Sequence, residues 1–510
     1  MNEDEYELEE QEKAIDRFNI DLPKVVLAFQ EAATKYSYHN EIPATISFYN
    51  ILGSISKDFV SIGDGFGRLD TRVHFLWIQT SGTGKSTLWN FVGPVSRRVY
   101  DMINRKGSHP MFSNPTYDET RAGEEFYIDS NPPYLERRFD IFGITDYTDA
   151  ALIGNLKIKE ETVINEDDNT RERVPVMTRL VGSLEGDGIA HWDEFEYSGI
   201  FKKSQHNEKS VVYLNTLMNT LHGENWIIKK SLDAYEGLDH SCFSQRSVLA
   251  MTYPPSNLAD VMVRTGVLQR FLIYVKNVPE QLQDEIRRTK IRNSGSFQTV
   301  EQPIDRFADA IFKIYELLDE RYREVDGQTD RVITFSPEYN DTFMLEYERL
   351  MKYIDGTRPE VRTIVSTFLN RMNDSIIRMA VLSCIASAPS ITDKSKRFIV
   401  TGKNVQQAAK IVKQCYASLV DWIDESIKVK KKSSLAETSL KINFFNAFKE
   451  LKEVSTNGKV GKGALFRLVG ERVGKSNMQV SRDWHKVSEY FNEEKNGRQK
   501  FVDIKEGVEE

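Results

Sequence analysis

Residues suited to hold a phosphate group stand close together in the sequence QTSGTGKST, which begins at position 79. Gly82 and Gly84 let the backbone turn its N–H groups inward around an anion, a turn that a Cβ atom would hinder. The Lys85 ammonium supplies positive charge for phosphate oxygens, and the Ser86 hydroxyl is a ligand for Mg²⁺. We therefore expect a loop that binds nucleotide. Its binding residues would be Thr80, Ser81, Gly82, Thr83, Gly84, Lys85, Ser86 and Thr87.

The flanking residues predict the two elements that position this loop. An apolar run over 73–78 is typical of a buried strand, and the apolar-periodic segment after Lys85 is typical of a helix. Strand, loop and helix in this order form the setting of the P-loop, where the positive end of the helix faces the anion. Gln79 departs from the pattern G-x-x-x-x-G-K-[ST], which has glycine there. A plain glycine–serine turn with a solvated lysine is the alternative interpretation.

A pair of carboxylates follows a second short strand, in the sequence GIAHWDEFE that begins at Gly188. Asp193, at the end of this strand, would hold Mg²⁺ together with Ser86, and Glu194 would act as the general base toward the attacking water. His191 makes the strand less apolar than is usual. An ordinary surface Asp-Glu pair is the alternative. The sequence thus predicts ATP and Mg²⁺ as cofactors.

Composition sets limits on the partners and on the cellular setting. The net charge is −8, so contact with nucleic acid requires local basic patches in an acidic background. Cys242, Cys384 and Cys415 lie far apart, which argues against a zinc site or a disulfide framework and fits a reducing cytoplasm. No apolar run is long enough to span a membrane, and no cleavable signal is visible. We expect a cytoplasmic protein without a membrane partner.

A length of 510 residues predicts several domains, and composition suggests their boundaries. We expect an α/β protein with an acidic tail and helical N-terminal region over 1–70, and an ATPase core over 71–280. The core should contain a hairpin over 161–177, and a mainly helical lid should follow over 281–427. A basic linker over 428–437 should lead to a compact domain over 438–510.

The last domain reads as three helices (440–451, 463–472 and 477–491) followed by a turn and a strand (496–502). Three helices with a β-wing form the winged-helix arrangement, a variant of the helix-turn-helix. A domain of this kind contacts DNA through its third helix and its wing, and some serve instead to dock proteins. The candidate DNA-binding residues are Arg482, Lys486, Arg498 and Lys500.

The segment GDGIAHWDEFEYSG, over 186–199, resembles the strand-and-carboxylate segment of AAA+ helicases of the minichromosome-maintenance type. Further motifs resemble that family in the same order. They are the helix and hairpin over 214–230, the sensor-1 strand over 246–254, the arginine-finger segment over 268–275 and the sensor-2 helix over 370–380. The resemblance implies an AAA+ P-loop core, and the winged helix at the C-terminus agrees with it.

The resemblance also implies roles for single residues. Thr252 falls where sensor 1 normally has asparagine, and its hydroxyl would orient the attacking water. Arg270 would be an arginine finger that reaches the γ-phosphate held by a neighbouring subunit, where a delocalised cation stabilises the charge of the transferring phosphoryl group. Arg371 would be sensor 2 and would contact the same nucleotide. The plain alternatives are a surface ion pair for Arg270 and an amphipathic helix face for Arg371.

Lys229 and Lys230 end a predicted hairpin arm where the family carries a channel lysine that grips DNA phosphates. A ring of such cations follows a backbone without reading bases. A solvated lysine pair is the alternative. The hairpin over 161–177, with Arg171 and Arg173, is a weaker channel candidate because its tip over 166–168 is acidic.

Together these features predict a ring-forming, ATP-dependent DNA helicase of the replicative type, a homo-hexamer acting on single-stranded or forked DNA. Primase or other replication proteins are expected partners. The short region before the P-loop, without the cysteine pair of a zinc-bearing collar, suggests a virus, plasmid or other mobile element and hence a host cytoplasm. The alternatives are an AAA+ initiator or helicase loader, a DNA-binding regulator switched by nucleotide, and a packaging or transposition ATPase.

Overall fold

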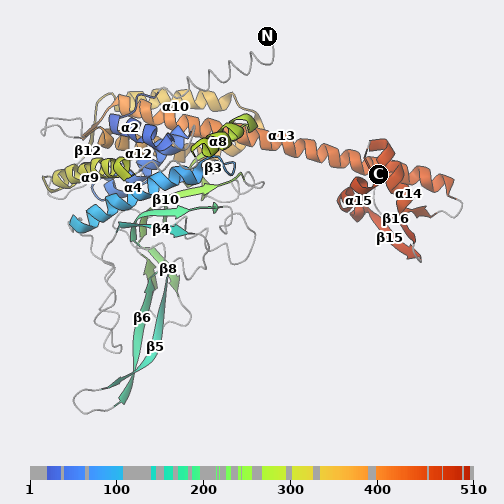
Figure 1. Cartoon of the computed structure of the whole chain (residues 1–510), viewed down its shortest axis with the longest axis horizontal. Helices are drawn as coiled ribbons and strands as arrows, with labels where there is room; N and C mark the ends of the chain where they lie inside the picture. Colours follow the sequence, from blue (N-terminus) through green and yellow to red (C-terminus); the bar gives the residue numbers. More distant parts are fainter. Residues whose placement is uncertain are drawn as a thin grey trace, which may run out of the picture. The chain divides into compact units, whose positions relative to one another are not determined.

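The computed structural model describes most of the chain in two compact units, Met1–Asp421 and Trp422–Glu510, and each unit is treated by itself below. The described residues are 20–35, 40–63, 68–106, 139–144, 154–164, 171–181, 186–195, 214, 217–218, 226–230, 239–242, 244–254, 267–293, 301–324, 333–388, 398–455, 459–473, 475–496 and 499–505. Figure 1 gives the labels of the helices and strands.

The first unit is built on a parallel sheet of five strands. These are β3 (Phe75–Gln79), β4 (Phe139–Ile144), β7 (Gly186–Trp192), β10 (Ser244–Thr252) and β11 (Leu272–Lys276). Their order in the sheet is β11-β3-β10-β7-β4, so β10 separates the two strands expected to carry the phosphate loop and the carboxylates. Every residue of β3 is buried, as a parallel sheet covered on both faces requires. The predicted α/β core is confirmed.

Helices cover this sheet and fill most of the remainder of the unit (Figure 1). They are α2 (Lys24–Thr34), α3 (Glu41–Ser56), α4 (Lys85–Lys106), α8 (Glu280–Asn293), α9 (Glu301–Glu324), α10 (Tyr339–Asp355), α11 (Pro359–Val365), α12 (Leu369–Ala386) and α13 (Gly402–Val454). Short elements join them, namely β1 (Ile62–Gly63), β2 (Arg68–Leu69), η2 (Leu268–Arg270), β12 (Ile333–Phe335), η4 (Ser366–Phe368) and β13 (Phe398–Val400).

Helix α3 belongs to the core, since all of its residues after Glu41 are buried and it packs on β3, β7 and β10. Asn50 holds it there by donating to the carbonyls of Val73 (2.6 Å) and Val248 (3.0 Å), which lie beside β3 and within β10. Gly53 permits a close approach, because a Cβ atom at that position would lie 2.3 Å from the Thr71 carbonyl oxygen. The helical N-terminal region is thus part of the foundation of the sheet.

Two hairpins are described in the first unit. In the first, β5 (Gly154–Ile164) pairs with β6 (Arg171–Val181) in antiparallel fashion, which confirms the predicted hairpin and makes it longer than 161–177. Its acidic tip lies outside the described residues. In the second, β8 (Trp226–Lys230) pairs with β9 (Asp239–Cys242), with an irregular register between Ile227 and Lys229.

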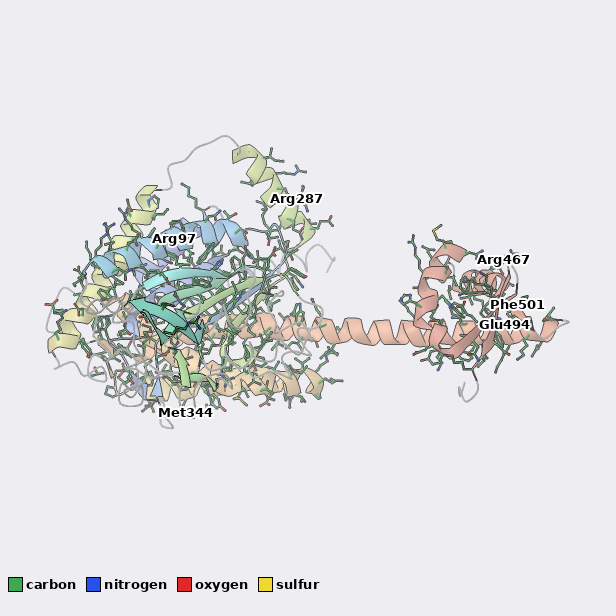
Figure 2. The ribbon with its side chains drawn as sticks, turned by 90° about the horizontal axis from the view of Figure 1, so that it is seen from below. Arg97, Arg287, Met344, Arg467, Glu494 and Phe501 are labelled. Atoms are coloured by element: carbon green, nitrogen blue, oxygen red, sulfur yellow. The ribbon has the colours of Figure 1, made fainter. Side chains whose placement is uncertain are left out.

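The second unit contains the end of α13, then β14 (Val460–Gly461), α14 (Lys462–Val473), α15 (Asn477–Asp483), η6 (Trp484–Lys486), η7 (Ser488–Tyr490), β15 (Phe491–Asn496) and β16 (Gln499–Ile504). The strands form an antiparallel sheet in the order β14-β16-β15. Glu494 and Phe501, labelled in Figure 2, are register partners across its hairpin. Phe444, Trp484 and Phe491 lie at the centre of the core beneath this sheet.

The structure changes two expectations for this part of the chain. The basic segment over 428–437 is helical, because it lies within α13, and lysine, alanine and glutamate favour helix. The third helix starts at a capping box of Ser476 and Gln479 but ends at Asp483 instead of 491. Residues 484–490 continue as 3₁₀ turns that place Trp484 and Val487 in the core. Among the described residues, no helix is both long and apolar enough to cross a bilayer.

Candidate nucleotide site

A cavity of about 160 Å³ lies at the carboxyl ends of the sheet strands, the edge where open α/β sheets bind ligands. The segments after β3, β7 and β10 all reach it, although they are far apart in sequence. The lining residues are Ser81, Gly82, Gly84, Lys85, Ser86, Thr87, Asp193, Glu194, Thr252 and Tyr253. The structure therefore brings the predicted phosphate loop and the predicted carboxylate pair to one place.

The glycines of the loop have the conformation that the sequence predicted. Gly82 has a φ of 78° and Gly84 a φ of 102°, both in the left-handed region that side chains disfavour. Helix α4 begins at Lys85, so its N-terminal N–H groups and its positive dipole end face the cavity. The Lys85 Nζ donates a hydrogen bond to the Gln79 carbonyl at the start of the loop.

Thr80 and Thr83, which were also predicted to bind nucleotide, do not line this cavity. Thr83 is buried, and its hydroxyl donates to the Thr80 carbonyl at 2.5 Å. The two threonines therefore tie the loop to itself. A backbone contribution of either residue to phosphate binding stays a prediction.

The glutamine in the first glycine position of the motif has a structural role that the sequence did not reveal. Gln79 is buried, and its Nε2 donates to both the carbonyl (3.0 Å) and the hydroxyl (2.7 Å) of Thr83. Its Oε1 accepts from the Trp77 Nε1 at 2.8 Å. These bonds join the end of β3 to the far side of the loop, so Gln79 braces the loop from inside.

The carboxylate pair lies just beyond β7, with both side chains exposed toward the cavity. Glu194 has a φ of 57°, in the left-handed region that is uncommon for residues other than glycine, asparagine and aspartate. Backbone strain of this kind collects at functional sites. At the other end of β7, Gly188 has a φ of 103°, and a Cβ there would lie 2.1 Å from the Asp140 carbonyl oxygen. Only glycine fits the close approach of β4 and β7.

His191, the polar residue that weakened the strand prediction, is buried and stacks on Trp89 of α4. The ring centroids are 3.6 Å apart and the ring planes differ by 2°. Burial, with a smaller contribution from the charge of Arg97, lowers the pKa of His191 to about 3, so the imidazole is neutral at physiological pH. This stack joins the helix that follows the phosphate loop to the strand that carries the carboxylates.

Thr252 and Tyr253 both line the cavity at the end of β10, but their side chains are disposed differently. Thr252 is 1% exposed, and its hydroxyl donates to the Tyr253 carbonyl at 3.0 Å. Tyr253 is 42% exposed. Sequence reasoning missed this tyrosine. The following Pro254 was the available signal, because matching it to the proline of Ala-Ala-Asn-Pro puts Tyr253 at the asparagine position.

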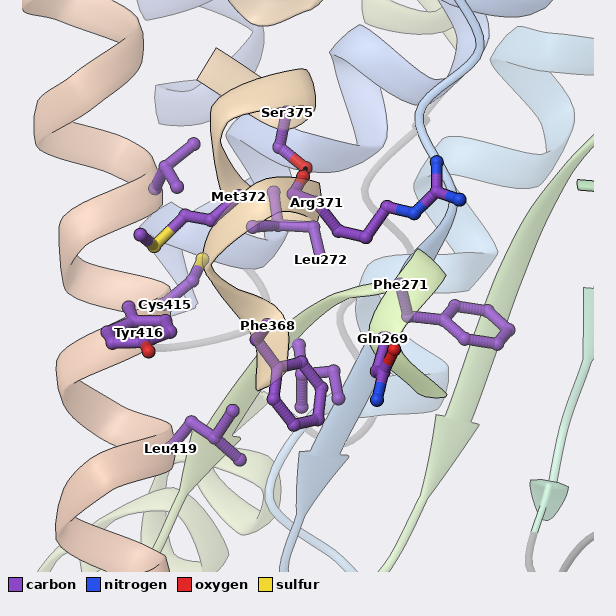
Figure 3. Close-up of a pocket in the computed structure, with 12 residues that line it drawn as sticks. Gln269, Phe271, Leu272, Phe368, Arg371, Met372, Ser375, Cys415, Tyr416 and Leu419 are labelled. Carbon is purple, nitrogen blue, oxygen red and sulfur yellow. Dashed lines mark hydrogen bonds between the residues drawn. The ribbon is translucent and has the colours of Figure 1, made fainter. Parts of the chain in front are cut away.

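Arg270 and Arg371 are close enough to interact with each other but do not line the nucleotide cavity of their own chain. Burial, and secondarily the charge of Arg371, lowers the pKa of the Arg270 guanidinium. Arg371 forms an ion pair with Asp374 at 3.1 Å. In Figure 3 its side chain extends away from the apolar residues that α13 contributes, among them Cys415 and Tyr416.

The structure describes the candidate DNA-binding residues unequally. Lys229 and Lys230 lie in β8, but their side chains are outside the described residues, as is all of Arg498. Lys486 forms an ion pair with Asp483 at 3.0 Å, so part of its charge is neutralised. Arg482 is exposed on α15. Lys500 is exposed on β16, directly opposite Lys495 of β15.

The residues present fit a magnesium ion held mainly by phosphate. Within the described ranges, no group of three or more His, Cys, Asp or Glu side chains could hold a metal by itself. Mg²⁺ is commonly bound by one or two carboxylates together with substrate phosphates and water. Ser86 and Asp193 offer a hydroxyl and a carboxylate to one cavity, which is the donor set that such a site needs.

The chain matches none of the protein-family models with which it was compared, and no curated protein in the comparison is significantly similar to it.

Proposed function

We propose that this protein is an AAA+ ATPase that binds ATP with Mg²⁺ and uses its hydrolysis to unwind DNA. The observation that carries the proposal is the single cavity shared by Lys85, Ser86, Asp193 and Glu194, which come from separate elements of a parallel sheet. A phosphate loop alone accounts for binding. The acidic pair on β7 adds the groups that hydrolysis needs.

In the proposed reaction, a water oxygen bonds to the γ-phosphorus and the bond to the bridging oxygen of ADP breaks. The Glu194 carboxylate orients this water and takes its proton. The loop N–H groups and Lys85 neutralise charge on the β- and γ-phosphates, and Lys85 exchanges its bond to the Gln79 carbonyl for phosphate oxygens. Bound Mg²⁺ would supply further charge neutralisation, with Ser86 and Asp193 as its protein ligands.

The position of Arg270 and Arg371 favours an assembly in which neighbouring subunits share each site. Both cations lie away from the cavity of their own chain, so a contact with γ-phosphate is more natural in the cavity of an adjacent copy. A guanidinium there would stabilise the charge of the transferring phosphoryl group. A homo-hexameric ring around single-stranded or forked DNA is the assembly we propose, with other replication proteins as partners.

The second unit has helices and an antiparallel hairpin in the order that a winged helix requires. We propose that it contacts DNA through Arg482 on α15 and through the hairpin that carries Lys495 and Lys500. Like charges directly opposite each other across two strands are unfavourable unless an anion lies between them. A DNA phosphate would supply that anion.

A strand-displacement assay on forked DNA tests this function. The wild-type chain should unwind the fork with ATP and Mg²⁺. Lys85→Ala should bind ATP at least tenfold more weakly because it loses the phosphate-binding cation, whereas Glu194→Gln should retain ATP and lose turnover. A wild-type chain that hydrolyses ATP without displacing a strand would favour a loader or a nucleotide-switched regulator. Undiminished ATP affinity in Lys85→Ala would refute the nucleotide site.

A further inference from the structure

Tyr253 is the aromatic side chain of the nucleotide cavity, and its environment differs from that of its neighbour Thr252. The Thr252 hydroxyl already donates to a backbone carbonyl, and the residue is buried. Tyr253 presents 42% of its surface and ends in a hydroxyl that can both donate and accept a hydrogen bond. Of the two, the tyrosine is the one that can reach a ligand.

The sheet register places Tyr253 between the phosphate loop and the carboxylate pair. Strand β10 pairs with β3 on one side, where Thr252 is the partner of Ile78. It pairs with β7 on the other side, where Ala250 is the partner of Trp192. Tyr253 therefore follows β10 at the level where β3 passes into the phosphate loop and β7 passes into Asp193. The last phosphate of a bound nucleotide belongs in this position.

We propose that the Tyr253 hydroxyl donates a hydrogen bond to the terminal phosphate of a bound nucleoside triphosphate, and so distinguishes it from a diphosphate. This inference rests on the nucleotide site proposed above. A hydrogen bond from a neutral donor to an ionised phosphate oxygen is charge-assisted and stronger than one between neutral groups. The phenol stays protonated, and no covalent bond forms or breaks at Tyr253.

Equilibrium binding to the full-length chain tests the proposal without depending on turnover. The probes are ADP and AMP-PNP, a triphosphate analogue that resists hydrolysis. Tyr253→Phe should weaken AMP-PNP binding about tenfold, the loss expected for one hydrogen bond to a charged group, and should leave ADP affinity unchanged. Tyr339→Phe, a matched change on α10 outside the cavity lining, should alter neither affinity.

Other outcomes would overturn the proposal. If Tyr253→Phe keeps the wild-type preference for AMP-PNP, the hydroxyl does not reach the phosphate. If Tyr253→Ala weakens ADP and AMP-PNP equally while Tyr253→Phe weakens neither, the ring packs against another part of the nucleotide. If Thr252→Val alone loses the preference, the neighbouring threonine performs the role.

The result is separable from the fate of the proposed function. Failure of the wild-type chain to unwind DNA would refute the helicase function, whereas the two affinities would still decide the role of Tyr253. Conversely, unchanged affinities in Tyr253→Phe would refute only this role in a chain that unwinds DNA.

Discussion

At the scale of single residues, Gln79 shows how this chain manages without the first glycine of the motif. Its amide satisfies the indole of Trp77 on one side and the carbonyl and hydroxyl of Thr83 on the other, all in a buried setting. A glycine would leave these groups without their partner. The loop shape therefore depends here on a side chain where the usual motif depends on a flexible backbone.

Gln79→Gly should consequently destabilise the protein even though it restores the motif. Leaving a buried donor or acceptor unsatisfied costs about 1–3 kcal/mol, so we expect the unfolding free energy from denaturant titration to fall by about that amount. Trp77→Phe removes the indole donor, so Gln79→Gly should cost less in that background. Equal costs in both backgrounds would mean that the bond to Trp77 contributes nothing.

His74 predicts a pH dependence of stability. Burial first, then the charges of Arg72 and Arg378, hold the pKa of His74 well below its ordinary value. The neutral ring is used, since its Nδ1 accepts from the Val248 N–H at 3.2 Å. Below about pH 6.5 the unfolded chain binds a proton that the folded chain refuses, so stability should fall by about 1.4 kcal/mol per pH unit for this group.

Thermal and denaturant unfolding between pH 4 and pH 8, limits chosen to bracket the ordinary histidine pKa of about 6.5, would measure this slope. His74→Asn offers an amide oxygen near the position of Nδ1 and cannot titrate, so its slope should be shallower than that of the wild type. A residual slope is expected from His191, whose pKa is also lowered. An unchanged slope would show that His74 is protonated in the folded protein.

At the scale of elements, the ring stack between Trp89 and His191 links helix α4 to strand β7. Aromatic pairs of this kind contribute about 0.5–1.5 kcal/mol beyond the area that they bury. Trp89→Leu and His191→Leu should therefore show a coupling energy of that size in a double-mutant cycle of unfolding. ATP turnover should fall in either single variant, because the phosphate loop and the carboxylates lose a shared support. Strictly additive effects would refute the link.

The elements also show what the sequence could and could not predict. Strand β3, the glycine turn and α4 follow from local patterns of apolar and glycine residues, and the hairpin of β5 and β6 follows from alternation. The early end of α15 could not be predicted, because the burial of Trp484 and Val487 outweighs local helix propensity. The brace of Gln79 and the exposure of Tyr253 depend on tertiary contacts between strands, which a single sequence does not encode by spacing.

At the scale of the whole molecule, the functional groups of one chain fall into two sets. One set faces the cavity, and the other consists of Arg270 and Arg371, which interact with each other outside it. Two cations in one place repel each other unless an anion is near, and Asp374 is the described anion paired with Arg371. The triphosphate of an adjacent subunit would be a second anion, so assembly and catalysis should depend on each other.

Mixing two inactive variants tests this dependence. Arg270→Ala should bind ATP with wild-type affinity but lose at least tenfold in turnover, because the missing guanidinium stabilises only the transition state. Glu194→Gln should also be inactive, since it lacks the general base. In a mixed assembly, a cavity with an intact Glu194 meets an intact Arg270 from its neighbour, so ATP hydrolysis should partly return at intermediate ratios. Mixing Arg270→Ala with Lys85→Ala should restore activity by the same logic, whereas Glu194→Gln mixed with Lys85→Ala should not, because both lesions lie in the same cavity. Restoration in that last mixture, or its absence in the first two, would contradict the sharing of sites between subunits.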